Sequence, residues 1–233
     1  PYQISTLANL NWMSGNQLDK HYIQMNDIDA TATDDGGAGF SPIGNSYSSP
    51  FTGSYDGQGH TIDGLTINRG STNYIGLFGH TDGATISNLG VTNVNYTGRV
   101  FNGGLVGRNT NSDIINCYST GSVSSGDNQD VGGLVGESWQ NSQIINSYSH
   151  VNVTGKIRIG GLVGYNQDGA EISYCYSTGN VKAIDDADCQ NIGGLVGTNS
   201  SGTISFSYST GSVSEWGGRE TDNVGGLIGS NAG

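Results

Sequence analysis

Apolar positions recur along this chain with a nearly fixed period. A short phrase, Gly-Leu-x-Gly with Phe, Val or Ile at x, occurs six times in the 233 residues. Its copies start 28, 29, 28, 33 and 32 residues apart, at Gly76, Gly104, Gly133, Gly161, Gly194 and Gly226. A period of this length is typical of solenoids, whose repeats bury their apolar faces only against neighbouring repeats. The pattern therefore predicts one elongated domain.

Superimposing the copies gives columns that indicate side-chain direction. A column of isoleucines predicts a strand that stacks in parallel with its apolar side buried. Its members are Ile86, Ile114, Ile144, Ile172 and Ile204. The residue after each Gly-Leu-x-Gly phrase is chemically varied, so we expect that column to face solvent. Its members are His80, Arg108, Glu137, Tyr165, Thr198 and Ser230.

A corner follows the isoleucine strand. The second residue after isoleucine is Asn88, Asn116 or Asn146 in three copies and Tyr174 or Phe206 in two. The next residue is Leu, Cys or Ser, and the Leu and Cys members indicate that this column is buried. Simple alternation would instead place it on the face of the strand opposite to isoleucine. A left-handed backbone at the Asn position would reset the alternation. Behind the corner come a tyrosine column, Tyr118, Tyr148, Tyr176 and Tyr208, and a valine column, Val123, Val153, Val181 and Val213.

These columns define the fold class. Each repeat holds about three short strands, and no window after the first ~20 residues shows the helical period of 3.6. We predict an all-β fold, a right-handed parallel β-helix (β-solenoid) with one three-strand rung per 28–33-residue repeat. Apolar residues spaced by about three after Ser5 and Thr6 predict a short N-terminal capping helix. Residues 1–75 would form the cap and opening rungs, and 76–233 the repeat β-helix, within one continuous solenoid.

Charge and composition narrow the class of partner. The net charge is −12, with only 8 Lys plus Arg, so no basic patch is available to neutralise phosphates. No stretch approaches the ~18 apolar residues of a membrane span. We expect no nucleic-acid partner and no membrane insertion of this segment.

The three cysteines do not form a disulfide framework. Cys117 and Cys175 occupy the same column two rungs apart. At ~4.8 Å per rung their separation is roughly 9–10 Å, too far for a bridge, and both should be small buried residues. The sequence leaves the state of Cys189 open.

Candidate catalytic groups form no set with a known geometry. The histidines, His21, His60, His80 and His150, make no H-E-x-x-H or comparable zinc motif. Asp56 lies close to His60 in sequence, but the spacing supplies neither a second carboxylate nor a basic partner. We assign no catalytic residue.

Acidic residues recur in the loop before Gly-Gly-Leu, and stacked rungs would align these loops along one edge. The densest group is Asp185, Asp186 and Asp188, whose oxygens make it a candidate Ca²⁺ site. The alternative is a solvated acidic rim that keeps the edge soluble. We expect no other cofactor. The full set is Asp127, Asp130, Asp185, Asp186, Asp188, Glu215, Glu220 and Asp222.

The tyrosine column is a candidate glycan-binding surface. Flat aromatic faces of Tyr118, Tyr148, Tyr176 and Tyr208 would stack on sugar rings. The alternative is a corner ladder in which these tyrosines pack on one another.

The Gly-Leu-x-Gly copies, the opening Ile4-Ser5-Thr6-Leu7 and the segment 51–62 resemble the GLUG repeats of bacterial surface proteins. Such repeats occur in large adhesins and in regions of IgA1-specific metallopeptidases. The resemblance implies an exported bacterial protein, extracellular or at the cell surface. It does not bring peptidase activity with it, since the zinc-binding histidines are missing.

We therefore expect a non-enzymatic structural or adhesive module that binds a glycan or a protein on a host or neighbouring cell. A carbohydrate-binding or carbohydrate-active β-helix is one alternative, which a glycan-cleavage assay would identify. Another is a self-assembling extracellular filament subunit, joined end to end through unpaired strand groups of the last rung.

Overall fold

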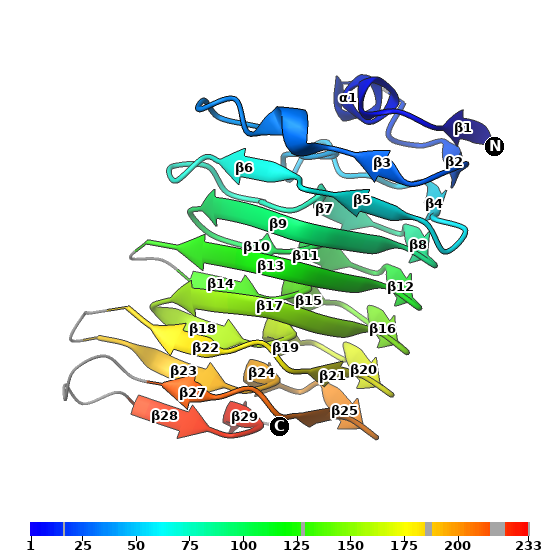
Figure 1. Cartoon of the computed structure of the whole chain (residues 1–233). Helices are drawn as coiled ribbons and strands as arrows, with labels where there is room; N and C mark the ends of the chain where they lie inside the picture. The colour runs from blue at the N-terminus through cyan, green and yellow to red at the C-terminus, as the bar shows by residue number, and fades with distance from the viewer. Residues whose placement is uncertain (16, 127–128, 185–187, 215–221, 233) are drawn as a thin grey trace.

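The chain folds into a right-handed parallel β-solenoid (Figure 1). The computed structural model describes residues 1–15, 17–126, 129–184, 188–214 and 222–232. Every pairing between named strands is parallel, and each strand pairs with its counterpart one rung away, as in Ile114 with Ile86 and Ile144. The predicted fold class is confirmed.

In the described part of the chain, four sheets run along the solenoid. We name them the edge, front, first back and second back sheets. The edge sheet contains β1 (Tyr2–Ile4), β2 (His21–Gln24), β4 (Ser54–Asp56), β8 (Thr85–Ser87), β12 (Asp113–Ile115), β16 (Gln143–Ile145), β20 (Glu171–Ser173) and β25 (Thr203–Ser205). The front sheet contains β3 (Ile28–Asp29), β5 (Thr61–Asp63), β6 (Thr66–Asn68), β9 (Gly90–Gly98), β13 (Tyr118–Ser125), β17 (Tyr148–Gly155), β21 (Tyr176–Ser177), β22 (Val181–Ala183), β26 (Tyr208–Ser209) and β27 (Val213–Ser214).

The two back sheets lie behind the front sheet. The first back sheet contains β10 (Asn102–Gly103), β14 (Gln129–Gly132), β18 (Ile157–Gly160), β23 (Gln190–Gly193) and β28 (Asp222–Gly225). The second back sheet contains β7 (Phe78–Asp82), β11 (Val106–Thr110), β15 (Val135–Trp139), β19 (Val163–Gln167), β24 (Val196–Ser200) and β29 (Ile228–Ala232).

A rung such as β14–β15–β16–β17 contributes a strand to each of the four sheets, one more than the three predicted. The extra strand arises from a kink at Gly-Gly-Leu, where the backbone folds closely on itself. The kink separates the strand of the first back sheet from the strand of the second back sheet. A Cβ on Gly103 would lie 2.2 Å from the Val106 carbonyl oxygen, and one on Gly107 would lie 2.7 Å from the Phe101 carbonyl oxygen. Only glycine permits this approach.

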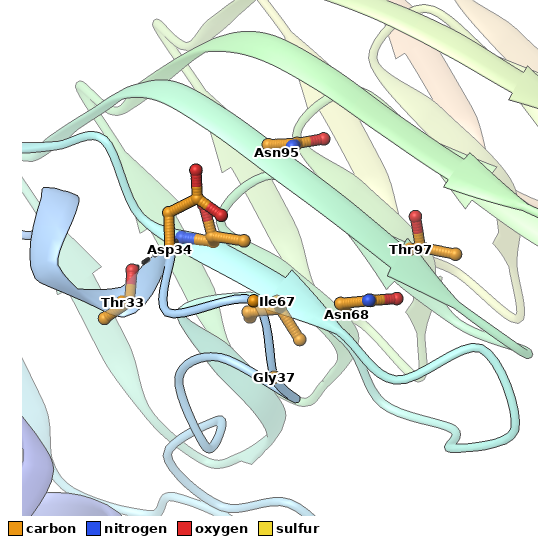
Figure 2. Close-up of a pocket in the computed structure, with 9 residues that line it drawn as sticks. Thr33, Asp34, Gly37, Ile67, Asn68, Asn95 and Thr97 are labelled. Atoms are coloured by element: carbon orange, nitrogen blue, oxygen red, sulfur yellow. Dashed lines mark hydrogen bonds between the residues drawn. The ribbon is translucent and has the colours of Figure 1, made fainter.

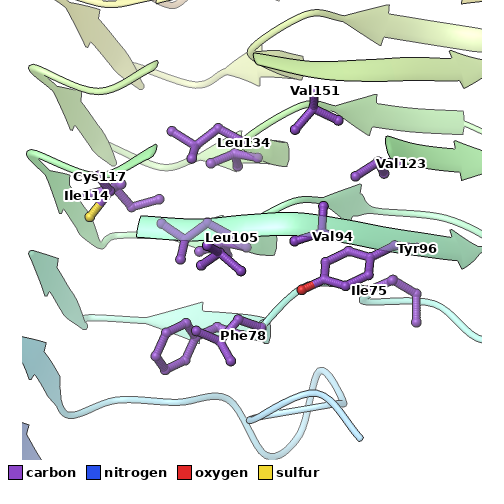
Figure 3. Packing of buried hydrophobic residues seen from close by; sticks show 14 of the residues in the cluster. Ile75, Phe78, Val94, Tyr96, Leu105, Ile114, Cys117, Val123, Leu134 and Val151 are labelled. Carbon is purple, nitrogen blue, oxygen red and sulfur yellow. The ribbon is translucent and has the colours of Figure 1, made fainter. Parts of the chain in front are cut away.

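The core lies between the front and back walls. Ile86, Ile114, Ile144 and Ile172 are buried, as predicted, and Ile204 packs against the same core. Figure 3 shows Leu105 and Leu134, from successive rungs, lying one above the other inside the solenoid. Like residues thus stack on like residues along the axis.

The corner column has the predicted left-handed backbone. The φ values are 53°, 54°, 49°, 55° and 48° at Asn88, Asn116, Asn146, Tyr174 and Phe206. The following residue is fully buried in Leu89, Cys117, Ser147 and Cys175. The left-handed residue therefore turns the chain from the edge sheet into the front sheet and resets its alternation.

The cysteines are buried and form no disulfide. Burial raises the pKa of Cys117 to about 12 and that of Cys175 to about 11. Cys189 is also buried, and its thiol donates to the Ile184 carbonyl oxygen at 3.4 Å.

The prediction that the residue after Gly-Leu-x-Gly faces solvent is wrong. His80, Glu137 and Thr198 are 2%, 4% and 8% exposed. The kink folds the two back sheets toward each other on their outer side, so this column packs against the residues that precede the kink. The rings of His80 and Tyr74, for example, stack at 5.6 Å.

The N-terminal end is covered by helix α1 (Leu7–Gly15), within the first 20 residues as predicted (Figure 1). Leu10 and Met13 are its buried residues. Thr6 Oγ1 accepts a hydrogen bond from the Asn9 amide at 3.3 Å, an N-cap contact. The other helical segment of the described chain is the single turn η1 (Thr31–Thr33), and no described helix is long and apolar enough to cross a membrane.

Substitution within β16 tests the assignment of inward and outward positions. Ile144→Asp would bury an unpaired carboxylate, and we expect a loss of more than about 4 kcal/mol of unfolding free energy. Ile145→Asp, at the neighbouring half-exposed position, should cost within about 1 kcal/mol. Urea denaturation of both variants measures the difference. Equal losses would contradict the assignment of faces.

Candidate functional site

The predicted tyrosine column is assembled as a ladder at the start of the front sheet. The ring centroids of Tyr118 and Tyr148 are 4.9 Å apart, those of Tyr148 and Tyr176 4.8 Å, and those of Tyr176 and Tyr208 5.2 Å. Interplanar angles of 5° to 6° make the rings parallel. Gly90 lies under the Tyr118 ring, at the end of the ladder nearest the N-terminus. A Cβ on Gly90 would lie 2.5 Å from that ring.

Stacking covers most ring faces in this ladder. Tyr148 and Tyr176 have a ring on each side and are half-buried. Burial raises the pKa of both phenols. The His150 ring meets Tyr148 edge-on, with centroids 5.0 Å apart. This arrangement agrees with a self-packed ladder, and its use for glycan binding stays a prediction.

The candidate calcium residues are only partly placed. Asp185 and Asp186 lie outside the described residues. Asp188 is described: it is exposed, and its carboxylate is 3.9 Å from the Lys156 ammonium. Among the residues that the structure describes, no three His, Cys, Asp or Glu side chains come together as a metal site. The calcium proposal therefore has no geometric support in the described part of the chain.

Asp130 departs from the expected solvated rim. It is 2% exposed and forms a bidentate ion pair with Arg158, in which Arg158 Nη2 donates to Asp130 Oδ2 at 2.9 Å. Sequence reasoning placed this residue in an exposed loop, but it belongs to β14 and sits just before the kink.

A second ion pair lies beside the first, and together they form the kink cluster: Arg108, Asp130, Glu137 and Arg158. Arg108 Nε is 2.7 Å from Glu137 Oε2, and both side chains are largely buried. Gln167 Nε2 donates to Glu137 Oε1 at 2.6 Å. Sequence reasoning missed this cluster. Its signal is opposite charge one repeat apart, at 108 and 137 and at 130 and 158.

Aromatic rings enclose the two arginines of the kink cluster. The Arg108 guanidinium lies 4.4 Å from the centroid of the Trp139 ring and 5.3 Å from that of Phe101. Arg158 lies 4.5 Å from the Tyr165 ring centroid. These cation–π contacts hold the guanidinium groups against the back sheets. The side chains fill the outer angle of the kink, which indicates a structural role.

Burial changes the protonation of the kink cluster. It raises the pKa of Glu137 to about 7, and Arg108 only partly offsets the effect. Burial also raises the pKa of Asp130, although the nearby guanidinium of Arg158 acts to lower it. His80 lies further along the same column, between the rings of Tyr47 and Tyr74, and burial lowers its pKa.

Asp56 and His60 occupy turn positions. Asp56 accepts hydrogen bonds from the Gln58 amide and from Asn88 Nδ2, both at 3.0 Å. His60 Nδ1 lies 3.3 Å from Asp27 in an exposed contact. These partners explain both residues as turn and ladder groups.

A polar pocket of about 230 Å³ lies near the N-terminal end, between the η1 turn and the front sheet (Figure 2). It is lined by Thr33 and Asp34, at the end of the turn, and by Asn68 of β6 and Asn95 and Thr97 of β9, all labelled in Figure 2. Its hydroxyl, amide and single carboxylate groups provide hydrogen bonds. They offer fewer charged oxygens than a calcium site normally uses.

Comparisons with known proteins agree with the repeat pattern. The model of the GLUG motif family matches residues 103–124, 127–154 and 155–182, which confirms the resemblance seen in the sequence. Halomucin of Haloquadratum walsbyi is 38% identical over 163 residues, covering 66% of this chain and 2% of halomucin. A proposed Gly-rich membrane protein of Evansella cellulosilytica is 43% identical over 81 residues, 34% of this chain and 9% of that protein. The chain thus spans a small fraction of these curated relatives.

A solved structure has the same architecture. The crystal structure of a proposed immunoglobulin A1 protease from Bacteroides ovatus matches with a TM-score of 0.68, over 100% of this chain and 83% of that one. Its sequence identity is 17%, so the likeness shows the fold alone.

The kink cluster predicts a pH-dependent stability. The pKa of Glu137 is about 7 in the folded chain against an ordinary 4.5, so the folded state binds more protons between these values. Its contribution to stability is therefore fully present below pH 4.5 and is lost as pH rises through 7, on the order of 3 kcal/mol.

Glu137→Gln keeps the shape of the side chain and removes this titration. We expect the wild type to lose unfolding free energy relative to Glu137→Gln between pH 5 and 8, measured by urea denaturation. Glu171→Gln, in the edge sheet, is the control and should retain the wild-type slope. Identical slopes for the wild type and Glu137→Gln would contradict the raised pKa.

Proposed function

We propose that this chain, built of GLUG repeats, is a rigid non-enzymatic segment of an exported surface protein, with adhesive contacts made by its outward side chains. The observation that carries this proposal is the uninterrupted stack of rungs. Eight strands of the edge sheet pair in one unbroken parallel order, from β1 to β25. Such a stack is a stiff rod that can hold binding residues away from a surface.

The relatives support an extracellular setting. One similar protein is named as a membrane protein, and the solved structure with the same fold is described as a proposed protease of immunoglobulin A1. The strongly acidic composition, with a net charge of −12, suits a soluble exposed rod.

The described side chains favour a scaffold over an enzyme. Asp56 and His60 are explained by turn contacts, and the buried carboxylates Asp130 and Glu137 are paired with arginines. A carbohydrate-active β-helix would need acid and base groups beside a substrate site. End-to-end filament formation, the other alternative, stays a prediction.

Surface location can be tested on the cells that produce the protein. An antibody against residues 76–126 should label intact cells, and added protease should remove the signal. Lysis should be needed to label a cytosolic protein in the same cells, which serves as the control. Labelling of this segment only after lysis would contradict the proposal.

The non-enzymatic role predicts no turnover of polysaccharides. The purified chain, incubated with neutral and anionic polysaccharides, should release no more reducing ends than heat-denatured chain. Turnover that disappears in the Asp56→Asn, His60→Ala double variant would show that these two residues are catalytic.

A further inference from the structure

The corner column changes its chemistry along the solenoid. Asn88, Asn116 and Asn146 occupy it in three rungs, and Tyr174 and Phe206 in the next two, all with φ between 48° and 55°. Asparagine tolerates this left-handed backbone, whereas a bulky aromatic residue there is strained. The two aromatic residues are therefore unfavourable choices for the corner itself.

The asparagines also make contacts that the aromatic residues cannot replace. Asn116 Nδ2 donates to Asn88 Oδ1 at 3.1 Å, and Asn88 Nδ2 donates to Asp56 Oδ1 at 3.0 Å. Tyr174 and Phe206 give up this amide ladder. They stack on each other instead, with ring centroids 4.9 Å apart and an interplanar angle of 10°.

Burial does not explain the aromatic residue at position 174. Tyr174 is 57% exposed. Tyr174 belongs to an interior rung, between the corner residues Asn146 and Phe206, so its exposure does not come from a missing neighbour. The short Asn146 side chain replaces the ring that would cover its second face. Tyr148 and Tyr176, by contrast, have rings on both faces.

The pair adjoins the C-terminal part of the tyrosine ladder. Cys175 points into the core between Tyr174 and Tyr176, so both tyrosines lie on the outside of the same edge. In the next rung, which is the last of the edge sheet, Phe206 and Tyr208 repeat this arrangement. We call Tyr174, Tyr176, Phe206 and Tyr208 the corner patch. An exposed aromatic ring in an interior rung, Tyr174, with further rings gathered beside it, indicates a binding surface.

We propose that the corner patch binds a neutral polysaccharide, which deepens and rests on the adhesive role proposed above. The open face of an aromatic ring carries negative charge density that attracts the C–H face of a sugar ring. The tyrosine hydroxyls, with Ser173, Ser205 and Thr178 beside them in the sequence, provide donors and acceptors for sugar hydroxyls. The repeat along the solenoid axis presents these groups to successive units of one polymer.

Charge selects a neutral ligand. Segments 171–178 and 203–210, which carry the patch, contain no Lys or Arg and a single acidic residue, Glu171. Nucleobases stack on similar aromatic platforms, but their phosphates require cations that these two segments lack. The net charge of −12 likewise repels anionic glycans.

The test is affinity electrophoresis of the purified full chain in native gels containing xylan, mannan or mixed-linkage β-glucan, with alginate as the anionic comparison. We expect at least one neutral polymer to retard the chain and alginate not to do so. The Tyr174→Asn, Phe206→Asn double variant restores the residue found at the other corners. It should bind at least tenfold more weakly, with a melting temperature equal to or above that of the wild type, because the backbone strain is relieved.

Trp12→Asn is the matched control, since Trp12 is a half-exposed aromatic residue on α1 at the other end. It should leave retardation unchanged. No retardation by any neutral polymer, or equal retardation of the double variant, would overturn the proposal. Concentration-dependent association in light scattering that the double variant abolishes would overturn it too, and would identify a contact between copies. Each negative result leaves the cell-surface labelling of the segment intact, so failure of this inference is distinguishable from failure of the proposed function.

Discussion

Parallel backbone pairing between successive rungs is the constraint on which the structure depends. A single rung cannot satisfy its strand N–H and C=O groups or cover its apolar side chains, so both tasks fall to the neighbouring rungs. In-register stacking then places each residue over its counterpart. Isoleucine columns fill the core, and the tyrosines form a ladder with rings 4.8 to 5.2 Å apart. Corner residues must share one backbone conformation, which favours asparagine.

The glycine kink adds a second constraint with electrostatic consequences. Close backbone approach at Gly103 and Gly107 divides the back wall into two sheets and closes their outer angle. Side chains that would otherwise face water are enclosed there, and the charged ones need partners. Arg108 with Glu137 and Arg158 with Asp130 provide these partners across one rung. The same enclosure raises the pKa of Glu137. The kink in the backbone therefore makes the stability of the fold depend on pH.

The scaffold leaves the outward side chains free to vary, which separates the fold from the site. The solved structure with this architecture is 17% identical to the chain, so the architecture tolerates wide change in sequence. The corner patch uses this freedom. Tyr174 and Phe206 keep the left-handed turn that the fold requires while giving up the asparagine ladder, and the ring of Tyr174 is exposed within the stack.

The sequence by itself determined the repeat, the parallel solenoid, the inward isoleucines, the left-handed corner and the tyrosine ladder, because each is a property of residues in register along the axis. It also placed the capping helix and separated Cys117 from Cys175. Only the tertiary structure decided how different strands within one rung are arranged. These strands belong to different columns, so the repeat pattern does not record their contacts. The fourth strand, the burial of Glu137 and the pairing of Asp130 with Arg158 arise from the angle at the kink, which no column of like residues records. The exposure of Tyr174 also needed the structure, because the sequence does not show how an aromatic side chain at the corner packs against its neighbours.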